Sequence, residues 1–158
     1  MKKIIGIAFA VLAITINTWA APKQLSAAEV NISKLKEIIG EQYGTSVTEG
    51  GMLIIRCGDG RQAFLFIDPE EKLIDLRSKW HTKPSVTKQQ CLEMMNDWLL
   101  NSSPLSVAYD TNKKMFVLGH ILSYKGGVII ENLFAVLTVF LQNDISFAKQ
   151  AHDAGLLK

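Results

Sequence analysis

The sequence is poor in cysteine, with Cys57 and Cys91 as the only two among its 158 residues. A disulfide-rich scaffold is therefore excluded, and a chain of this length does not need one because it can bury a hydrophobic core. Two alternatives remain for this pair. One is a single bridge, which an oxidising compartment permits, and the other is two free thiols packed as small apolar side chains.

Histidine is also scarce, and the spacings that mark metal or catalytic sites are missing. His81, His120 and His152 lie in different predicted elements, with no second histidine or cysteine at metal-ligand spacing. The G-x-S-x-G elbow, the Walker loop and the dinucleotide fingerprint are absent. Cys91 is a poor nucleophile candidate, because it falls on the apolar face of a predicted helix. We therefore predict a protein that is not an enzyme and that uses no cofactor or metal.

The one long uncharged apolar run lies at the N-terminus. Residues 1–20 combine two lysines, this apolar run and small residues before Ala21, which is the pattern of a secretory signal peptide. The run is too short for a membrane-spanning helix. We expect a Sec-type signal cleaved after Ala20, a single domain over residues 21–158, no stable membrane anchor, and a periplasmic or secreted location in a bacterium.

The mature chain has no net charge. Loss of Lys2 and Lys3 with the signal reduces the 17 basic residues to 15, which equals the 15 acidic residues. A neutral chain has no long-range electrostatic field to attract a polyanion, so we expect neither nucleic acid nor an anionic membrane as a partner.

Internal repeats and low-complexity segments are absent as well.

Periodicity predicts a helix followed by a meander of strands. Ser26 and Glu29 match a capping box, apolar residues recur at helical spacing up to Tyr43, and Gly44 ends the predicted helix. Short β-rich runs follow at residues 45–48, 52–57, 62–67 and 72–80. The last run alternates between apolar and charged residues, so one face of this strand is expected to pack against the core and the other to face solvent. We predict three or four antiparallel strands here.

Two glycines flank Asp59 in the segment RCGDGR, residues 56–61. Strand-like runs bracket Gly58 to Arg61, which favours a hairpin turn. A phosphate-binding loop would need a helix after the glycines, so that free backbone N–H groups face the anion. Because a strand follows instead, we predict a turn.

The second half of the chain adds two helices and two strands. A capping pattern opens a helix over residues 87–101, strands follow at 105–109 and 115–122, and Gly126–Gly127 opens the last helix. The apolar face of the helix at residues 87–101 holds Cys91, Leu92, Met95, Trp98 and Leu99. The order predicts an α+β fold, in which helices pack on an antiparallel sheet.

The last helix is apolar over an unusually wide arc. Between Val128 and Leu141 its polar residues are Glu131, Asn132 and Thr138 alone. Such a width fits a helix sandwiched inside the domain or one that partly covers a partner chain. We place the predicted interaction surface here, at Ile130, Phe134, Leu137, Phe140 and Leu141.

Two further groups of residues leave alternatives open. The first group fits either a ligand pocket or the core, and consists of Trp80, Trp98 and Tyr124. The second is a basic stretch along a strand end, which fits either the docking of an acidic partner or a solvated face. Its members are Arg77, Lys79, His81 and Lys83.

Short motifs over residues 26–150 carry a resemblance to a known family. They are Asn96-x-Trp98 on a helix, Tyr109–Asp110 at a strand end, and Gly126–Gly127 before the last helix. With them the chain resembles an exported member of the YbjN family of candidate bacterial sensory transduction regulators. The resemblance implies a fold like that of type III secretion chaperones, and it implies no catalytic residues. Family members tend to be charged after the tryptophan, whereas residues 99–103 are uncharged here, which weighs against a partner-contact role for them.

These expectations combine into a non-enzymatic periplasmic module that binds a protein partner or a second copy of itself. The alternative is a small-ligand sensor with its pocket between the helix at residues 87–101 and the sheet, near Trp80 and Trp98.

Overall fold

The computed structural model describes residues 22–101 and 105–158, so the predicted signal peptide lies outside the described residues. No helix in the described part is long and apolar enough to cross a membrane. The elements in chain order are β1 Gln24–Leu25, α1 Ile32–Ile39, β2 Gly44–Val47, β3 Leu53–Arg56, β4 Gln62–Asp68, β5 Leu73–His81, α2 Lys88–Asn101, β6 Ser106–Asp110, β7 Met115–Ser123, β8 Val128–Ile129 and α3 Ile130–Asp153.

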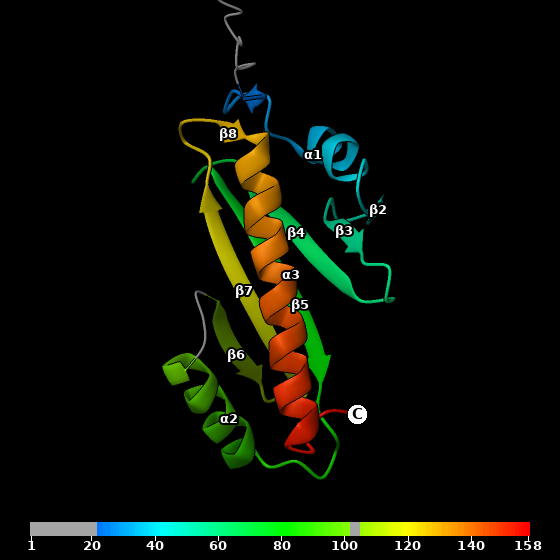
Figure 1. Ribbon diagram of the computed structural model, residues 1–158, viewed down its shortest axis with the longest axis vertical. Coiled ribbons are helices and arrows are strands. Elements are labelled where there is room, and N and C mark those ends of the chain that lie inside the picture. The colour runs from blue at the N-terminus through cyan, green and yellow to red at the C-terminus, as the bar shows by residue number, and fades with distance from the viewer. Residues whose placement is uncertain (1–21, 102–104) are drawn as a thin grey trace, which may run out of the picture.

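One antiparallel sheet of six strands forms a layer, in the order β2-β3-β4-β5-β7-β6. The long helix α3 runs along one face of this sheet, with α1 near one end of α3 and α2 near the other (Figure 1). The α+β class is therefore confirmed, and the meander contains four strands, β2 to β5. Strand β5 shows the predicted alternation, since Ile74 and Leu76 are buried while Arg77 and Lys79 are exposed.

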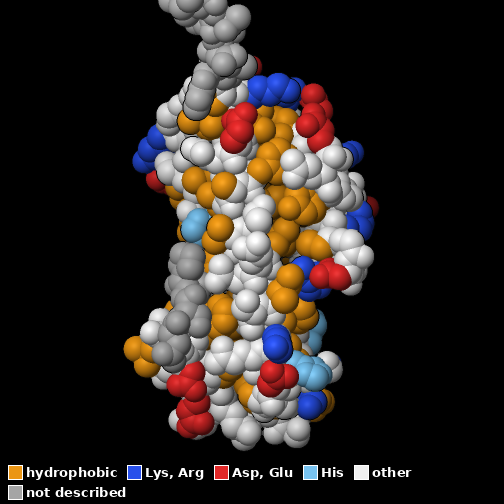
Figure 2. Space-filling model, viewed as in Figure 1, with side chains coloured by type: hydrophobic (Ala, Val, Ile, Leu, Met, Phe, Trp, Pro, Cys, Tyr) orange, Lys and Arg blue, Asp and Glu red, His pale blue; other side chains and the backbone are white. Residues whose placement is uncertain are grey.

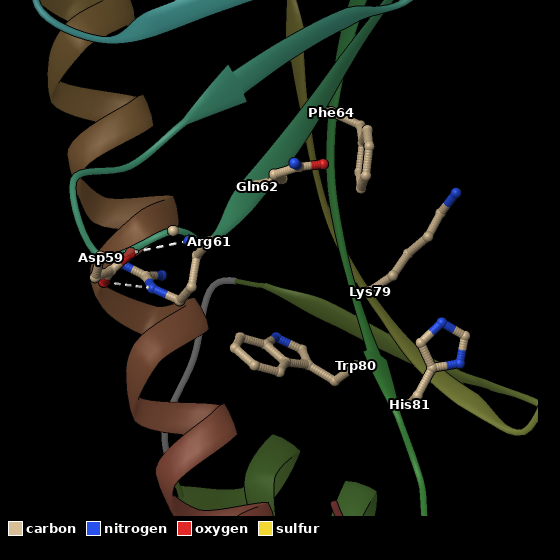
Figure 3. Close-up of a pocket in the computed structure, with 8 residues that line it drawn as sticks. Asp59, Arg61, Gln62, Phe64, Lys79, Trp80 and His81 are labelled. Carbon is tan, nitrogen blue, oxygen red and sulfur yellow. Dashed lines mark hydrogen bonds and ion pairs between the residues drawn. The ribbon is translucent and has the colours of Figure 1, made fainter. Parts of the chain in front are cut away.

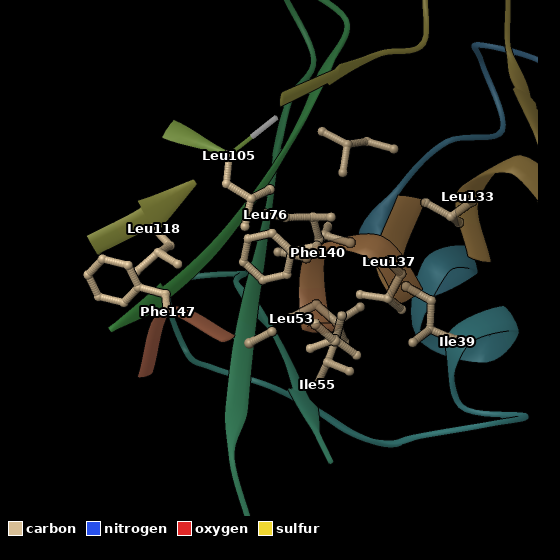
Figure 4. Packing of buried hydrophobic residues seen from close by; sticks show 14 of the residues in the cluster. Ile39, Leu53, Ile55, Leu76, Leu105, Leu118, Leu133, Leu137, Phe140 and Phe147 are labelled. Carbon is tan, nitrogen blue, oxygen red and sulfur yellow. The ribbon is translucent and has the colours of Figure 1, made fainter. Parts of the chain in front are cut away.

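The core lies between α3 and the sheet. Figure 4 shows Leu137 and Phe140 of α3 among Leu53, Ile55 and Leu76 of the strands. Burial of such side chains stabilises the fold by about 25 cal/mol for each Å² of apolar surface removed from water. The face of α3 that is turned to the sheet therefore packs against other residues of the same chain.

Helix α1 is shorter than predicted at both ends. Asn31 is its N-cap and accepts a hydrogen bond from the Lys34 N–H at 2.9 Å. The contacts of the predicted capping box do form, because the Glu29 carboxylate accepts from the N–H and hydroxyl of Ser26 at 2.8 and 2.7 Å, but they close a turn. The chain has to turn here because β1 pairs with β8 just before it. Gly44 begins β2 and does not end the helix.

Helix α2 begins as predicted, with reciprocal hydrogen bonds between Thr87 and Gln90. Its buried face was only partly predicted. Cys91 and Trp98 are buried, but Leu92 and Leu99 are 37% and 49% exposed. The helix is turned so that Trp98 meets Phe147 of α3 edge to face, with ring centroids 5.3 Å apart.

The two-stranded pairing of β1 with β8 was not predicted, and it changes the role of Gly126–Gly127. These glycines lead into β8, and α3 begins only at Ile130. Gly127 has a φ of 91°, and a Cβ on it would overlap the carbonyl oxygen of Leu25. Only glycine fits this close approach without strain.

We predict that Gly127→Ala lowers the free energy of unfolding by about 2 kcal/mol, because it adds both a strained φ and a clash with β1. Gly126→Ala is the matched control, since a Cβ there meets no atom within 4 Å. Urea unfolding of the two variants checks this. Equal stabilities would contradict the assigned role of Gly127.

Candidate functional site

The carboxylate of Asp144 is buried in the middle of α3, with 2% of the residue exposed. One oxygen accepts from the Ser78 hydroxyl at 2.5 Å and from the Trp80 indole N–H at 2.6 Å. The other oxygen accepts from Arg61 Nη1 at 2.8 Å. A buried charge is tolerated only when it is paired and hydrogen-bonded, and these donors from strand β5 and from the turn between β3 and β4 meet that requirement.

The turn between β3 and β4 delivers Arg61 to this carboxylate, and the predicted hairpin turn is confirmed. Gly60 has a φ of 85°, and Asp59 accepts hydrogen bonds from the backbone N–H of Arg61 at 3.1 Å and from its Nε at 2.7 Å. The Arg61 side chain therefore lies between two carboxylates.

These contacts shift the pKa values of the turn residues. The side-chain hydrogen bond from Arg61 holds the pKa of Asp59 below its ordinary value, so Asp59 stays ionised. Partial burial acts to lower the pKa of Arg61, but its hydrogen bonds to Asp59 and Asp144 outweigh that effect and raise the pKa. The turn thus presents a fixed guanidinium whose charge is already balanced.

A surface depression opens beside this network, and we call it the Trp80 groove. It consists of two adjoining cavities of about 480 and 550 Å³. Figure 3 shows the Trp80 ring turned toward Arg61 and α3, with Lys79 and His81 on the other side of β5. Both cavities share Asp59, Arg61, Lys79, Trp80 and His81; one adds Gly60, Gln62 and Phe64, and the other adds Ile145, Ala148, Lys149, His152, Leu157 and Lys158.

A gap in the sheet forms the groove. Strand β4 pairs with β5 only as far as Phe64 with Arg77, whereas β5 continues to His81. Beyond the gap the C-terminal tail pairs with the end of β5, since the Lys158 N–H donates to the His81 carbonyl at 3.2 Å. The edge of β5 therefore borders the groove between the hairpin turn and the tail.

The rim of the Trp80 groove is cationic. Lys79, Lys149 and Lys158 are exposed, and within the described residues none of them forms an ion pair. Asp59 is the only acidic residue among those that line the two cavities. Arg61 pairs with both Asp59 and Asp144, so these three side chains together carry one net negative charge against the three lysines. Figure 2 shows lysine and histidine side chains gathered near the C-terminal end of α3.

The structure corrects the predicted interaction surface on α3. Leu137, Phe140 and Leu141 are buried, because they pack into the chain's own core, although Phe140 also lines a small apolar cavity. Ile130 and Phe134 are half-buried. Of the two alternatives for the wide apolar arc, the sandwiched helix holds for this face of α3.

The aromatic group divides between core and surface. Trp98 and Tyr124 are buried, whereas Trp80 is half-buried and lines the groove. The groove is bordered by β4, β5, α3 and the tail, so Trp80 does not face a pocket under α2, contrary to the ligand-sensor alternative. Of the basic stretch, Lys79 and His81 line the groove, but Arg77 binds Asp75 at 2.6 Å.

The residues of the family motifs have packing or turn positions. Tyr109 stacks on Phe116 with centroids 5.4 Å apart, and Asp110 accepts from the N–H groups of Asn112 and Lys113 in the turn after β6. Trp98 packs as described above, while Asn96 is exposed. None of them lines the Trp80 groove.

Both cysteines are free thiols, so the bridge is not formed in this structure. Cys57 is half-buried at the end of β3, and Cys91 is buried on α2. Burial raises the pKa of both thiols, which makes them poor nucleophiles. Within the described residues, no group of three histidine, cysteine or acidic side chains is arranged to hold a metal ion.

Asp144 was missed, although the sequence holds a signal for it. It lies three residues from Leu141 and from Phe147, on the buried stripe of α3. A lone acidic residue within such a stripe indicates a buried polar contact, but its partners are distant in the chain. Lys149 and His152 carry no local signal, because their place in the groove depends on the tail.

Solved structures share this fold. YbjN from E. coli, a candidate transcription regulator, superposes with a TM-score of 0.68 at 17% identity, over 82% of this chain and 96% of that one. A chain of the ExsC–ExsE complex gives 0.50 at 15% identity, over 72% and 90%. A chain of the HopA1–SchA chaperone–effector complex gives 0.49 at 14%, over 72% and 93%.

The protein thus has a YbjN-like fold of the kind found in type III secretion chaperones, as the sequence resemblance implied. No protein-family model and no curated protein sequence matches the chain.

We predict that Asp144→Ala lowers the free energy of unfolding by about 3–5 kcal/mol, because it leaves the Ser78 hydroxyl and the Trp80 indole N–H without this acceptor and removes the ion-pair partner of Arg61 on α3. Asp153→Ala on the exposed end of α3 should change it by less than about 0.5 kcal/mol. Urea unfolding followed by circular dichroism measures both. A small loss for Asp144→Ala would show that the network does not hold the fold.

Proposed function

We propose that the protein is a non-catalytic protein-binding module, an exported member of the YbjN family that acts in the periplasm or outside the cell. The observation that carries this proposal is the Trp80 groove, which joins an aromatic floor to a rim of lysines that form no ion pair in the described part of the chain. Tryptophan is among the residue types that contribute most to the free energy of protein–protein binding, and it does so where its surroundings exclude water.

The fold supports protein binding. One chain of similar fold was solved in the ExsC–ExsE complex, in which it lies with another protein. The same layer of sheet and helices is available here, and the gap in the sheet gives a partner both side chains and a strand edge to contact.

The shape of the groove favours a chain as its occupant over a small metabolite. Small-ligand sites enclose most of the ligand surface. The Trp80 groove instead lies open between the hairpin turn and the tail, along the edge of β5. An open groove of this kind fits a segment that enters at one end and leaves at the other.

Export has a direct test. We expect the protein isolated from its bacterium to begin at Ala21, because signal peptidase cuts after the small residue Ala20. Intact-mass spectrometry of the periplasmic and medium fractions measures this. A full-length chain in the cytoplasmic fraction would contradict export.

Partner binding is tested by site-specific photo-crosslinking in the native cell. We expect p-benzoylphenylalanine in place of Ile145, which is 47% exposed and lines the groove, to yield a discrete protein adduct. The same substitution at Ile121, which is 61% exposed on β7, is the matched control outside the groove. Adducts at neither position, or equally at both, would contradict a binding role for the groove.

A further inference from the structure

We propose that the Trp80 groove binds an extended acidic segment of the partner protein, with carboxylates at the lysine rim and an apolar side chain against Trp80. This inference rests on the proposed function and names the chemistry of its partner. It follows from the charges, the sheet edge and the fixed indole.

Charge complementarity identifies the occupant as acidic. Three lysines that form no ion pair among the described residues come from separate elements, with Lys79 on β5, Lys149 on α3 and Lys158 on the tail. The groove is therefore lined by lysines from different elements. Asp59 offsets them only in part, because Arg61 pairs with both Asp59 and Asp144 and leaves one net negative charge beside three lysines. Carboxylates on the partner would supply the counter-charges that this chain lacks there.

The edge of β5 favours an extended conformation. Past the Phe64–Arg77 pair, no β4 residue is paired with β5, and the tail takes up pairing only at His81 and Thr82. An extended segment fits alongside Ser78 to Trp80 in this interval. In such a segment alternate side chains point in opposite directions, so one set faces Trp80 and the other faces solvent and the rim.

The floor of the groove selects an apolar contact. Trp80, Ile145 and Leu157 line it, and the indole N–H is already bound to Asp144 at 2.6 Å. Trp80 therefore offers its apolar ring rather than a hydrogen-bond donor. Because the ring is held in place before binding, little conformational entropy is lost when a partner packs on it.

Lys79 is held ready on the same surface. Its Nζ lies 4.8 Å from the centroid of the Phe64 ring, which places the charge at the edge of the gap. A cation over an aromatic ring at an exposed site is held weakly, so a carboxylate can draw the ammonium group away or share it.

The test uses a fluorescein-labelled peptide that alternates glutamate with phenylalanine, measured by fluorescence anisotropy with the mature protein. We expect this peptide to bind, and we expect versions with glutamine or lysine in place of glutamate to bind at least about tenfold more weakly. Binding should also weaken as salt is raised, because exposed charges are screened. A single-stranded oligonucleotide serves as the polyanion control and should not compete.

Charge-reversal variants locate the site. We expect Lys79→Glu and Lys149→Glu each to weaken binding by about tenfold. Lys125→Glu, on the exposed loop after β7 and outside the groove, should leave binding unchanged. Urea unfolding of all three variants confirms that they fold. Unchanged binding by the two groove variants would overturn the inference, and so would equal binding of the glutamine peptide or displacement by the oligonucleotide.

The outcomes separate this inference from the proposed function. A protein adduct at position 145 together with charge-independent peptide binding would retain the binding module and reject the acidic partner. Charge-dependent peptide binding without any adduct in cells would retain the groove's preference for acidic segments and reject the proposed role in a complex.

Discussion

The contact between Arg61 and Asp144 is the constraint on which the rest of the arrangement depends. A carboxylate buried to this extent costs several kcal/mol unless its lone pairs are satisfied. Here the donors come from the β3–β4 turn and from Ser78 and Trp80 of β5, while the acceptor lies on α3. The requirement to satisfy one carboxylate therefore fixes a turn, a strand and a helix relative to one another.

The Trp80 groove follows from the same contact. Arg61 lies immediately before β4, and its side chain reaches Asp144 on α3. The pairing of β4 with β5 ends at the Phe64–Arg77 pair, so the edge of β5 beyond it lies beside an indole that Asp144 holds in place. The same hydrogen-bond network stabilises the fold and holds Trp80 at the candidate binding surface. Substitutions in the network should therefore change both the stability of the fold and the shape of that surface.

Local sequence patterns predicted the helices and strands, but they did not predict contacts between residues that are distant in the chain. The alternation of β5, the glycines of the hairpin and the capping box of α2 are encoded within a few residues, and each was confirmed. The pairing of β1 with β8 joins residues about a hundred positions apart, and Arg61 meets Asp144 across 83 positions. Hydrophobic periodicity shows that a helix has an apolar arc, but it does not show whether the same chain or a partner covers that arc. For this reason the interaction surface predicted on α3 included residues that lie in the core.

The width of that arc explains why an acidic residue occupies position 144. A helix that is apolar over so much of its circumference can pack on a sheet in several rotations with similar burial of apolar surface. A well-packed apolar residue in place of a buried ion pair is often no less stable, so the pair is not required for stability alone. The observed rotation brings Asp144 to Arg61, Ser78 and Trp80, and a rotation of the helix away from it would separate the carboxylate from these donors. The carboxylate thus selects the rotation that buries Leu137 and Phe140 and leaves Ile145 and Lys149 at the groove.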